Sequence, residues 1–222
     1  MLVLLMAGFL AAGASGALES ARDRQDRATL EKISADALAN AARASNDAEA
    51  QYQAAVACSY LSEVLIEQRD KKASQQAAER GIKAAQRAVA LKPEAENYRV
   101  LATLYGQAIA DLLSGLSYGP KAKEAVNKAV EKAPRSSAVY VARGVGNYYV
   151  PAQLGGGVEA AIADFRKAIE LDARNAEAYL WLGLSLRRQN KDAEARQAFA
   201  KSLELDPNRV WAKQQLDKTP AK

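Results

Sequence analysis

The sequence offers few residues that could carry out chemistry. It contains no histidine, which removes the most common general base, the most common zinc ligand and any Ser-His or Cys-His nucleophile system. The only cysteine, Cys58, lies in a helical pattern without a partner for an intramolecular disulfide, so a buried apolar role is predicted. No pair of carboxylates stands at positions expected to be buried. We therefore predict a protein that is not an enzyme and that holds no metal and no cofactor.

One glycine-rich stretch raises the possibility of a phosphate-binding loop. Residues 147–165, NYYVPAQLGGGVEAAIADF, place a proline and three consecutive glycines in a chain that otherwise reads as helix. A phosphate cradle usually follows a strand and has Lys or Arg nearby, whereas here no strand is predicted and Glu159 puts negative charge where an anion would bind. We predict a turn: Pro151 ends one helix, and Gly155–Gly157 supply positive φ angles before the next helix begins near Val158.

Composition and charge favour an all-helical protein with a solvated surface. Helix formers dominate, with alanine most frequent, while the residues that favour strands are few. The net charge of +5 comes from interleaved basic and acidic residues, with no dense basic run. This spread predicts no nucleic-acid partner.

An internal repeat organises most of the chain. Residues 137–175 and 175–208 each open with a tyrosine four residues before a glycine and close with Ala-x3-Phe and a Leu-Asp helix end. In the last copy, the matching residues are Tyr179, Leu182, Gly183, Ala195, Phe199 and Pro207. Two earlier segments keep the closing half of the pattern. The pattern resembles the tetratricopeptide repeat (TPR), a helix-turn-helix unit of about 34 residues.

The resemblance implies an all-α fold, a right-handed TPR solenoid of about four helical hairpins with a preceding helix and a C-terminal capping helix. Small residues such as Ala168, Gly183 and Ala195 would let paired helices approach closely, and the hairpins must stack because one hairpin cannot bury its apolar stripe alone. The predicted TPR array spans 28–218, with units near 48–94, 95–136, 137–175 and 176–209 and a cap at 210–218.

The N-terminal residues predict export. Residues 1–17 contain an apolar run followed by small residues, as in a signal peptide, although the usual basic n-region is missing. We expect a bacterial periplasmic location. The alternative is an uncleaved leader that anchors the protein in the inner membrane, the only membrane contact expected. Residues 18–27 are predicted to be a flexible lead-in.

TPR proteins bind partners on the concave face, which the first helix of each hairpin lines, so the resemblance implies a scaffold for a protein or peptide. Outward positions of these helices, read by register, give the predicted groove residues Arg99, Gln107, Tyr148, Tyr149, Arg187 and Arg188. Tyrosines beside arginines suit an extended peptide with carboxylate or carbonyl groups. The two arginines could instead be last-turn cations of a helix, and the tyrosines could only cover the glycine turn.

A second candidate site lies where apolar residues continue past the expected end of a first helix, at Ile109, Leu112, Leu113 and Leu116. These residues would pack on the neighbouring hairpin or, in the alternative, line an apolar pocket with Tyr118. Exported bacterial TPR proteins associated with TRAP-type transporters are similar over roughly 48–207. That similarity rests on Pro151, on Gly155–Gly157, on the run ERGIKAAQRAVALKP and on the leader. It implies an alternative function, a solute-binding accessory for a small apolar or carboxylate ligand.

Overall fold

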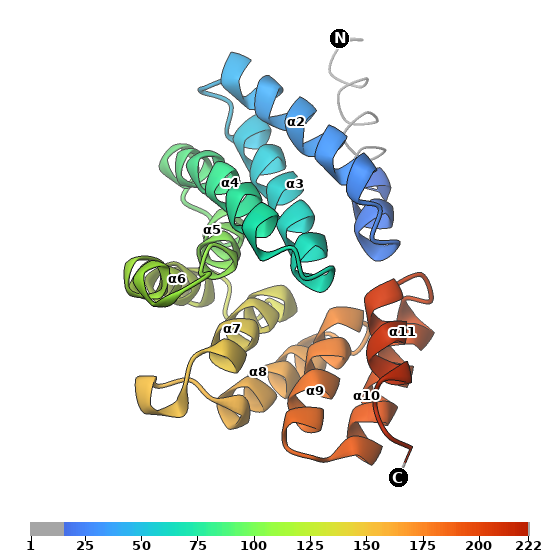
Figure 1. The fold of residues 1–222 in the computed structure, drawn as a ribbon. Coiled ribbons are helices and arrows are strands. Elements are labelled where there is room, and N and C mark those ends of the chain that lie inside the picture. Colours follow the sequence, from blue (N-terminus) through green and yellow to red (C-terminus); the bar gives the residue numbers. More distant parts are fainter. Residues whose placement is uncertain (1–15, 222) are drawn as a thin grey trace.

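The computed structural model describes residues 16–221, and no strand occurs among them. Helices joined by short connections pack in consecutive pairs, and the pairs stack into an arc (Figure 1). After a helical segment at residues 16–23, the helices are α2 (Arg27–Arg43), α3 (Ala48–Glu67), α4 (Lys71–Leu91), α5 (Ala95–Gln107), α6 (Leu112–Lys132), α7 (Ser137–Tyr149), α8 (Val158–Leu171), α9 (Ala176–Arg188), α10 (Asp192–Leu205) and α11 (Val210–Asp217). The predicted all-α solenoid of hairpins, with a leading and a capping helix, is confirmed.

Short polar side chains fix where several helices begin. Each accepts a hydrogen bond from a backbone N–H of the first turn, which has no partner inside the helix. These capping residues are Asp26 for α2, Asp47 for α3, Asp70 for α4, Asp111 for α6 and Asn175 for α9.

The α5–α6 hairpin differs from the prediction. Helix α5 ends at Gln107, and a capping box between Asp111 and Ser114 starts α6 at Leu112. The expected extension of the first helix past residue 107 is therefore wrong, because Leu112 begins the second helix of the hairpin. Local capping decided this boundary, whereas apolar periodicity alone runs through it.

The glycine break at 150–157 is a turn, as predicted. Val150 is extended before Pro151, and the short 3-10 helix η1 (Ala152–Leu154) follows. Gly155 and Gly157 have φ angles of 83° and 104°, a region that side chains with a Cβ avoid. The Gly157 amide donates to the carbonyl oxygen of Asn147 at 2.9 Å, which closes the turn, and α8 then begins at Val158.

The lead-in is ordered, contrary to the prediction of a flexible segment at 18–27. Residues 16–23 are helical, and Leu18 and Ala21 pack with Leu61 and Leu65 of α3 in one apolar cluster. Burial of these two apolar side chains stabilises the segment. The many charged residues around them in the sequence gave no sign of this burial. Residues 1–15, most of the predicted signal peptide, lie outside the described residues. Within residues 16–221, no helix is both long and apolar enough to cross a bilayer.

Two glycines allow the closest helix packing in the C-terminal half. A Cβ on Gly183 of α9 would lie 2.6 Å from Cε1 of Phe199, and one on Gly144 of α7 would lie 2.5 Å from Cε1 of Phe165. Both phenylalanines are fully buried, so neither ring has free space to move into. The predicted role of Gly183, close approach of paired helices, is confirmed.

Candidate binding surface

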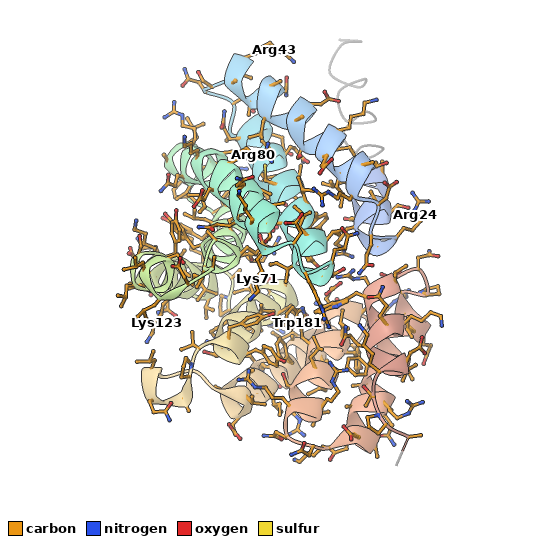
Figure 2. All side chains as sticks on the ribbon, viewed as in Figure 1. Arg24, Arg43, Lys71, Arg80, Lys123 and Trp181 are labelled. Carbon is orange, nitrogen blue, oxygen red and sulfur yellow. The ribbon has the colours of Figure 1, made fainter. Side chains whose placement is uncertain are left out.

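The first helices of successive hairpins form the inner side of the arc. Helix α3 contacts α5, α5 contacts α7, and α7 contacts α9. The side chains drawn in Figure 2 fill much of the space that the ribbon leaves open between the two ends of the arc. The inner side is therefore lined by the chain's own side chains, and its character depends on which of them stay exposed.

In the N-terminal half of the inner side, the predicted groove residue Arg99 is neutralised. Its guanidinium bonds both oxygens of Glu96, at 2.8 and 2.6 Å, and Tyr52 donates to the same carboxylate at 2.9 Å. Burial favours the neutral acid, but the hydrogen bonds and charge of Arg99 lower the pKa of Glu96. Gln107 donates to the carbonyl oxygen of Ser59 at 3.1 Å. The charge of Arg99 is therefore already compensated by Glu96, and the side-chain amide of Gln107 already donates to Ser59.

A buried group of charges joins the two ends of the arc. Arg209, 1% exposed, bonds Glu63 and Glu67 near the end of α3 and Glu177 at the start of α9. We call these four residues the closure cluster. The distances are 2.6 Å from Arg209 Nη2 to Glu63 Oε1 and 2.9 Å from Nε to Glu177 Oε1. Residues about 145 positions apart in the chain are thereby fixed side by side.

Neighbouring polar groups extend this contact between the ends. Arg22 lies over the ring of Tyr60 at 4.9 Å and 3.7 Å from the Glu177 carboxylate. Gln25 donates to Glu67 at 2.7 Å and accepts from Gln214 of α11 at 3.1 Å. The helical segment at 16–23 and the turn after it therefore take part in holding α11 to α3.

The closure cluster shifts the pKa values of its carboxyls in different directions. Burial raises the pKa of Glu63 to about 7 despite the attraction of Arg209. Burial likewise raises the pKa of Glu67, against the charge and hydrogen bond of Arg209. For Glu177 burial is outweighed by Arg209 and Arg22, so its pKa is lowered. Arg209 faces three carboxyls, and only Glu177 also has Arg22 close by, at 3.7 Å, so the three are not compensated equally.

Three of the predicted groove residues do come together. The Arg188 guanidinium lies 5.0 Å from the Tyr148 ring centroid and donates to the Tyr148 carbonyl oxygen at 2.7 Å. Tyr149 packs edge-on against Tyr148 and against Trp181, with centroids 5.1 and 6.1 Å apart. We call Tyr148, Tyr149, Trp181 and Arg188 the aromatic–arginine surface. It joins the end of α7 to α9.

Tyr149 is the accessible aromatic residue of this surface. Its side chain is 61% exposed, yet the surrounding chain raises the pKa of its hydroxyl to about 12, first through lost hydration and then through Tyr148, Glu63 and Glu67. Trp181, 9% exposed, stacks on Phe165 and meets Trp211 edge-on, so it forms a fixed base beneath Tyr149.

The remaining predicted groove residue, Arg187, faces the capping helix. It donates to the carbonyl oxygen of Gln215 at 3.2 Å and to its side-chain Oε1 at 2.7 Å, and to the Thr219 hydroxyl at 3.2 Å. Its guanidinium also lies 5.7 Å from the Phe199 ring centroid. Arg187 thus fixes α11 to α9, and the neighbouring Arg188 alone points to the aromatic surface.

The predicted apolar pocket does not form. Leu112, Leu113 and Leu116 are 78, 78 and 68% exposed, and Ile109 is 40% exposed, which is incompatible with an enclosed cavity. Tyr118, which would have joined them, stacks on Tyr105 at 5.8 Å instead. The pocket prediction assumed that these leucines continued the first helix, whereas α6 carries them outward.

Two observations concern residues that could carry out chemistry. Within residues 16–221, no group of three or more Cys, Asp or Glu side chains is arranged to hold a metal ion. Cys58 is fully buried, and burial raises the pKa of its thiol to about 11, which suppresses the reactive thiolate. The predicted role of Cys58 as a small buried apolar residue is confirmed.

Comparisons with known proteins agree with this architecture. The model of the tetratricopeptide repeat family matches residues 155–210. The solved structure of TTC0263, a thermophilic TPR protein of Thermus thermophilus, is 22% identical, with a TM-score of 0.54, and the match covers 73% of this chain and 81% of that one. No curated protein matches.

Two further solved structures are more distant. MamA (residues 41 to the end) of Desulfovibrio magneticus RS-1 is 18% identical, with a TM-score of 0.44 and coverage of 91% of this chain and 96% of that one. YrrB, described as a TPR protein with an unusual peptide-binding site, is 16% identical, with a TM-score of 0.41 and coverage of 75% and 80%. Residues 155–210 therefore match a tetratricopeptide repeat, and the fold of the described chain is that of a TPR solenoid.

Proposed function

We propose that this protein is an exported, non-catalytic scaffold that binds a peptide or an extended segment of a protein on its concave side. The observation that supports this proposal is the aromatic–arginine surface, where an exposed tyrosine stands on a rigid aromatic base beside an exposed arginine. The few residues that dominate the binding energy of protein interfaces are enriched in tyrosine, tryptophan and arginine.

The surface suits a peptide for two physical reasons. Tyr149 offers a large apolar contact area with few rotatable bonds, so little conformational entropy is lost on binding. Arg188 uses one nitrogen on the Tyr148 carbonyl oxygen, which orients the guanidinium and leaves its other N–H groups for a carboxylate or a backbone carbonyl. The closure cluster ties the start of α9, the helix that carries Trp181 and Arg188, to the end of α3 before a ligand arrives.

A random-peptide display selection on the immobilised protein tests the proposal. We expect selected peptides to bind the Tyr149→Ser and Arg188→Ala double variant at least about 10-fold more weakly, because both interface anchors are removed. Arg166→Ala, at an exposed position on α8, serves as the control and should bind as the original protein does. Selected peptides that bind the double variant equally well would contradict the proposed surface.

The export part of the proposal rests on the leader-like residues 1–17. Fusion of these residues to an alkaline phosphatase that is active only outside the cytoplasm should give an active reporter. An inactive reporter, with the fusion protein retained in the cytoplasm, would contradict export.

A further inference from the structure

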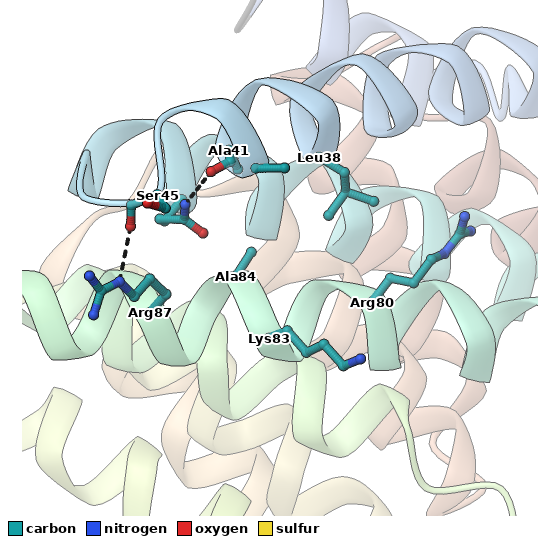
Figure 3. A pocket seen from close by; sticks show the side chains of 9 residues that line it. Leu38, Ala41, Ser45, Arg80, Lys83, Ala84 and Arg87 are labelled. Carbon is teal, nitrogen blue, oxygen red and sulfur yellow. Dashed lines mark hydrogen bonds between the residues drawn. The ribbon is translucent and has the colours of Figure 1, made fainter.

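A basic hollow opens between α2 and α4 (Figure 3). Its volume is about 390 Å³. Its apolar lining residues are Leu38, Ala41, Ala42 and Ala84, of which Ala41 and Ala84 are buried and form the floor, and its remaining lining residues are Ser45, Gln51, Arg80, Lys83 and Arg87. Small side chains leave this space open, because three of the four apolar lining residues are alanines.

Three cations line the hollow and no acid does. Arg80, Lys83 and Arg87 occupy one face of α4 at spacings of three and four residues, and all three are exposed. Arg87 is held at the rim by its hydrogen bond to the Ser45 carbonyl oxygen, at 3.0 Å, and by Asn46. Within residues 16–221, Arg80 and Lys83 take part in none of the ion pairs.

The acid nearest in sequence does not neutralise them. Glu79 accepts a hydrogen bond from Gln75 at 3.1 Å, and its charge acts on Tyr118 of α6, so it faces the opposite flank of α4. The side-chain amide of Gln51 donates hydrogen bonds to the carbonyl oxygens of Ala41 and Ala44, at 2.7 and 3.4 Å. Arg80 and Lys83 are therefore the cations at the hollow that no ion pair compensates, and Arg87 adds the N–H groups that Ser45 and Asn46 leave unused.

We propose that this hollow binds an acidic, amphipathic segment of a partner protein, at a second site separate from the aromatic–arginine surface. The segment's apolar side chains enter the alanine-lined floor, and its carboxylates meet Arg80 and Lys83. A cavity of about 150 Å³ already holds a benzene ring, so the hollow has space for more than one apolar side chain. A small molecule would be poorly enclosed in a hollow this open, whereas a chain segment can lie along the two turns of α2 and of α4 that line it.

The test measures binding of a short fluorescein-labelled peptide of leucine and glutamate to the full chain by anisotropy. Arg80→Ala with Lys83→Ala should weaken binding roughly 10-fold or more, because both charge contacts are lost. Ala42→Phe fills the hollow from an exposed position and should weaken binding without disturbing the core. Replacement of the peptide's glutamates by glutamine, or of its leucines by serine, should also abolish most of the binding.

A charge-matched control separates a site from general attraction to a basic protein. Lys121→Ala with Lys123→Ala removes two exposed lysines from α6, outside the hollow, and should leave binding unchanged. Arg80→Glu with Lys83→Glu should instead bind a peptide of leucine and lysine. The proposal is overturned if the peptide does not bind the original protein, or if both pairs of alanine substitutions weaken binding equally.

Discussion

Removal of the Arg209 guanidinium tests whether the two ends of the arc are held together by charge. The change Arg209→Met keeps an apolar side chain of similar length but leaves Glu63, Glu67 and Glu177 facing one another without their shared cation. Arg209 and Glu67 are each 1% exposed, so water cannot replace the lost partner unless the contact opens. Breaking a buried ion pair on one side typically costs about 3–5 kcal/mol of folding free energy.

The folding free energy lost in Arg209→Met should depend on pH, and the direction of this dependence follows from the pKa of Glu63. Its pKa is about 7 in the folded protein against an ordinary value of 4.5, so the folded state binds this proton more tightly than the unfolded state. The stability from that proton is present below pH 4.5 and is lost as the pH rises through about 7. Without Arg209 the carboxyls retain protons still more strongly. We therefore expect the full loss of about 3–5 kcal/mol near pH 8 and a smaller loss near pH 5, where the carboxyls can be neutral.

Urea unfolding followed by circular dichroism at both pH values measures this effect. Lys201→Met, which breaks an exposed pair with Glu204, is the control and should cost at most about 1 kcal/mol at either pH. A loss below about 1 kcal/mol for Arg209→Met, or an equal loss at both pH values, would refute the view that the closure cluster contributes to stability through buried charge.

Two further predictions concern packing and reactivity. Gly144→Ala should destabilise the protein by about 1–3 kcal/mol, since its methyl would lie 2.5 Å from the buried Phe165 ring. Gly146→Ala in the same helix has no atom within 4 Å of the new methyl and should stabilise the protein by up to about 1 kcal/mol in the same thermal or urea melt, so equal effects of the two changes would contradict the packing argument. Cys58 should react with a thiol reagent at pH 8 only after unfolding, because its thiol is fully buried and its pKa is about 11; rapid reaction of the native protein would contradict this.

Local sequence features predicted the repeat and the glycine turn because each depends on residues close together in the chain. Gly183 and Phe199 stand at a fixed spacing within one hairpin. Pro151 and Gly157 define a turn because proline fixes its φ angle and glycine tolerates a positive one. The boundary between α5 and α6 was missed because apolar periodicity continues across it. The signal was present in Asp111 and Ser114, which form a capping box.

The closure cluster could not be predicted in the same way. Glu63 and Glu67 are one helical turn apart and read as an ordinary solvated face, and nothing in the sequence states that Arg209 meets them. Their contact depends on the summed rotation of every hairpin between them. The sequence also could not show that two neighbouring arginines have different roles. Arg187 contacts the capping helix, whereas Arg188 lies over the ring of Tyr148.

The most direct test of the central claim is hydrogen–deuterium exchange of the full chain, with and without a peptide from the display selection. Binding on the concave side predicts slower exchange in the last turn of α7, around Tyr148 and Tyr149, and in α9 around Trp181 and Arg188. Protection confined to α2 and α4, with no change in α7 and α9, would contradict the claim that the aromatic–arginine surface is the principal binding site.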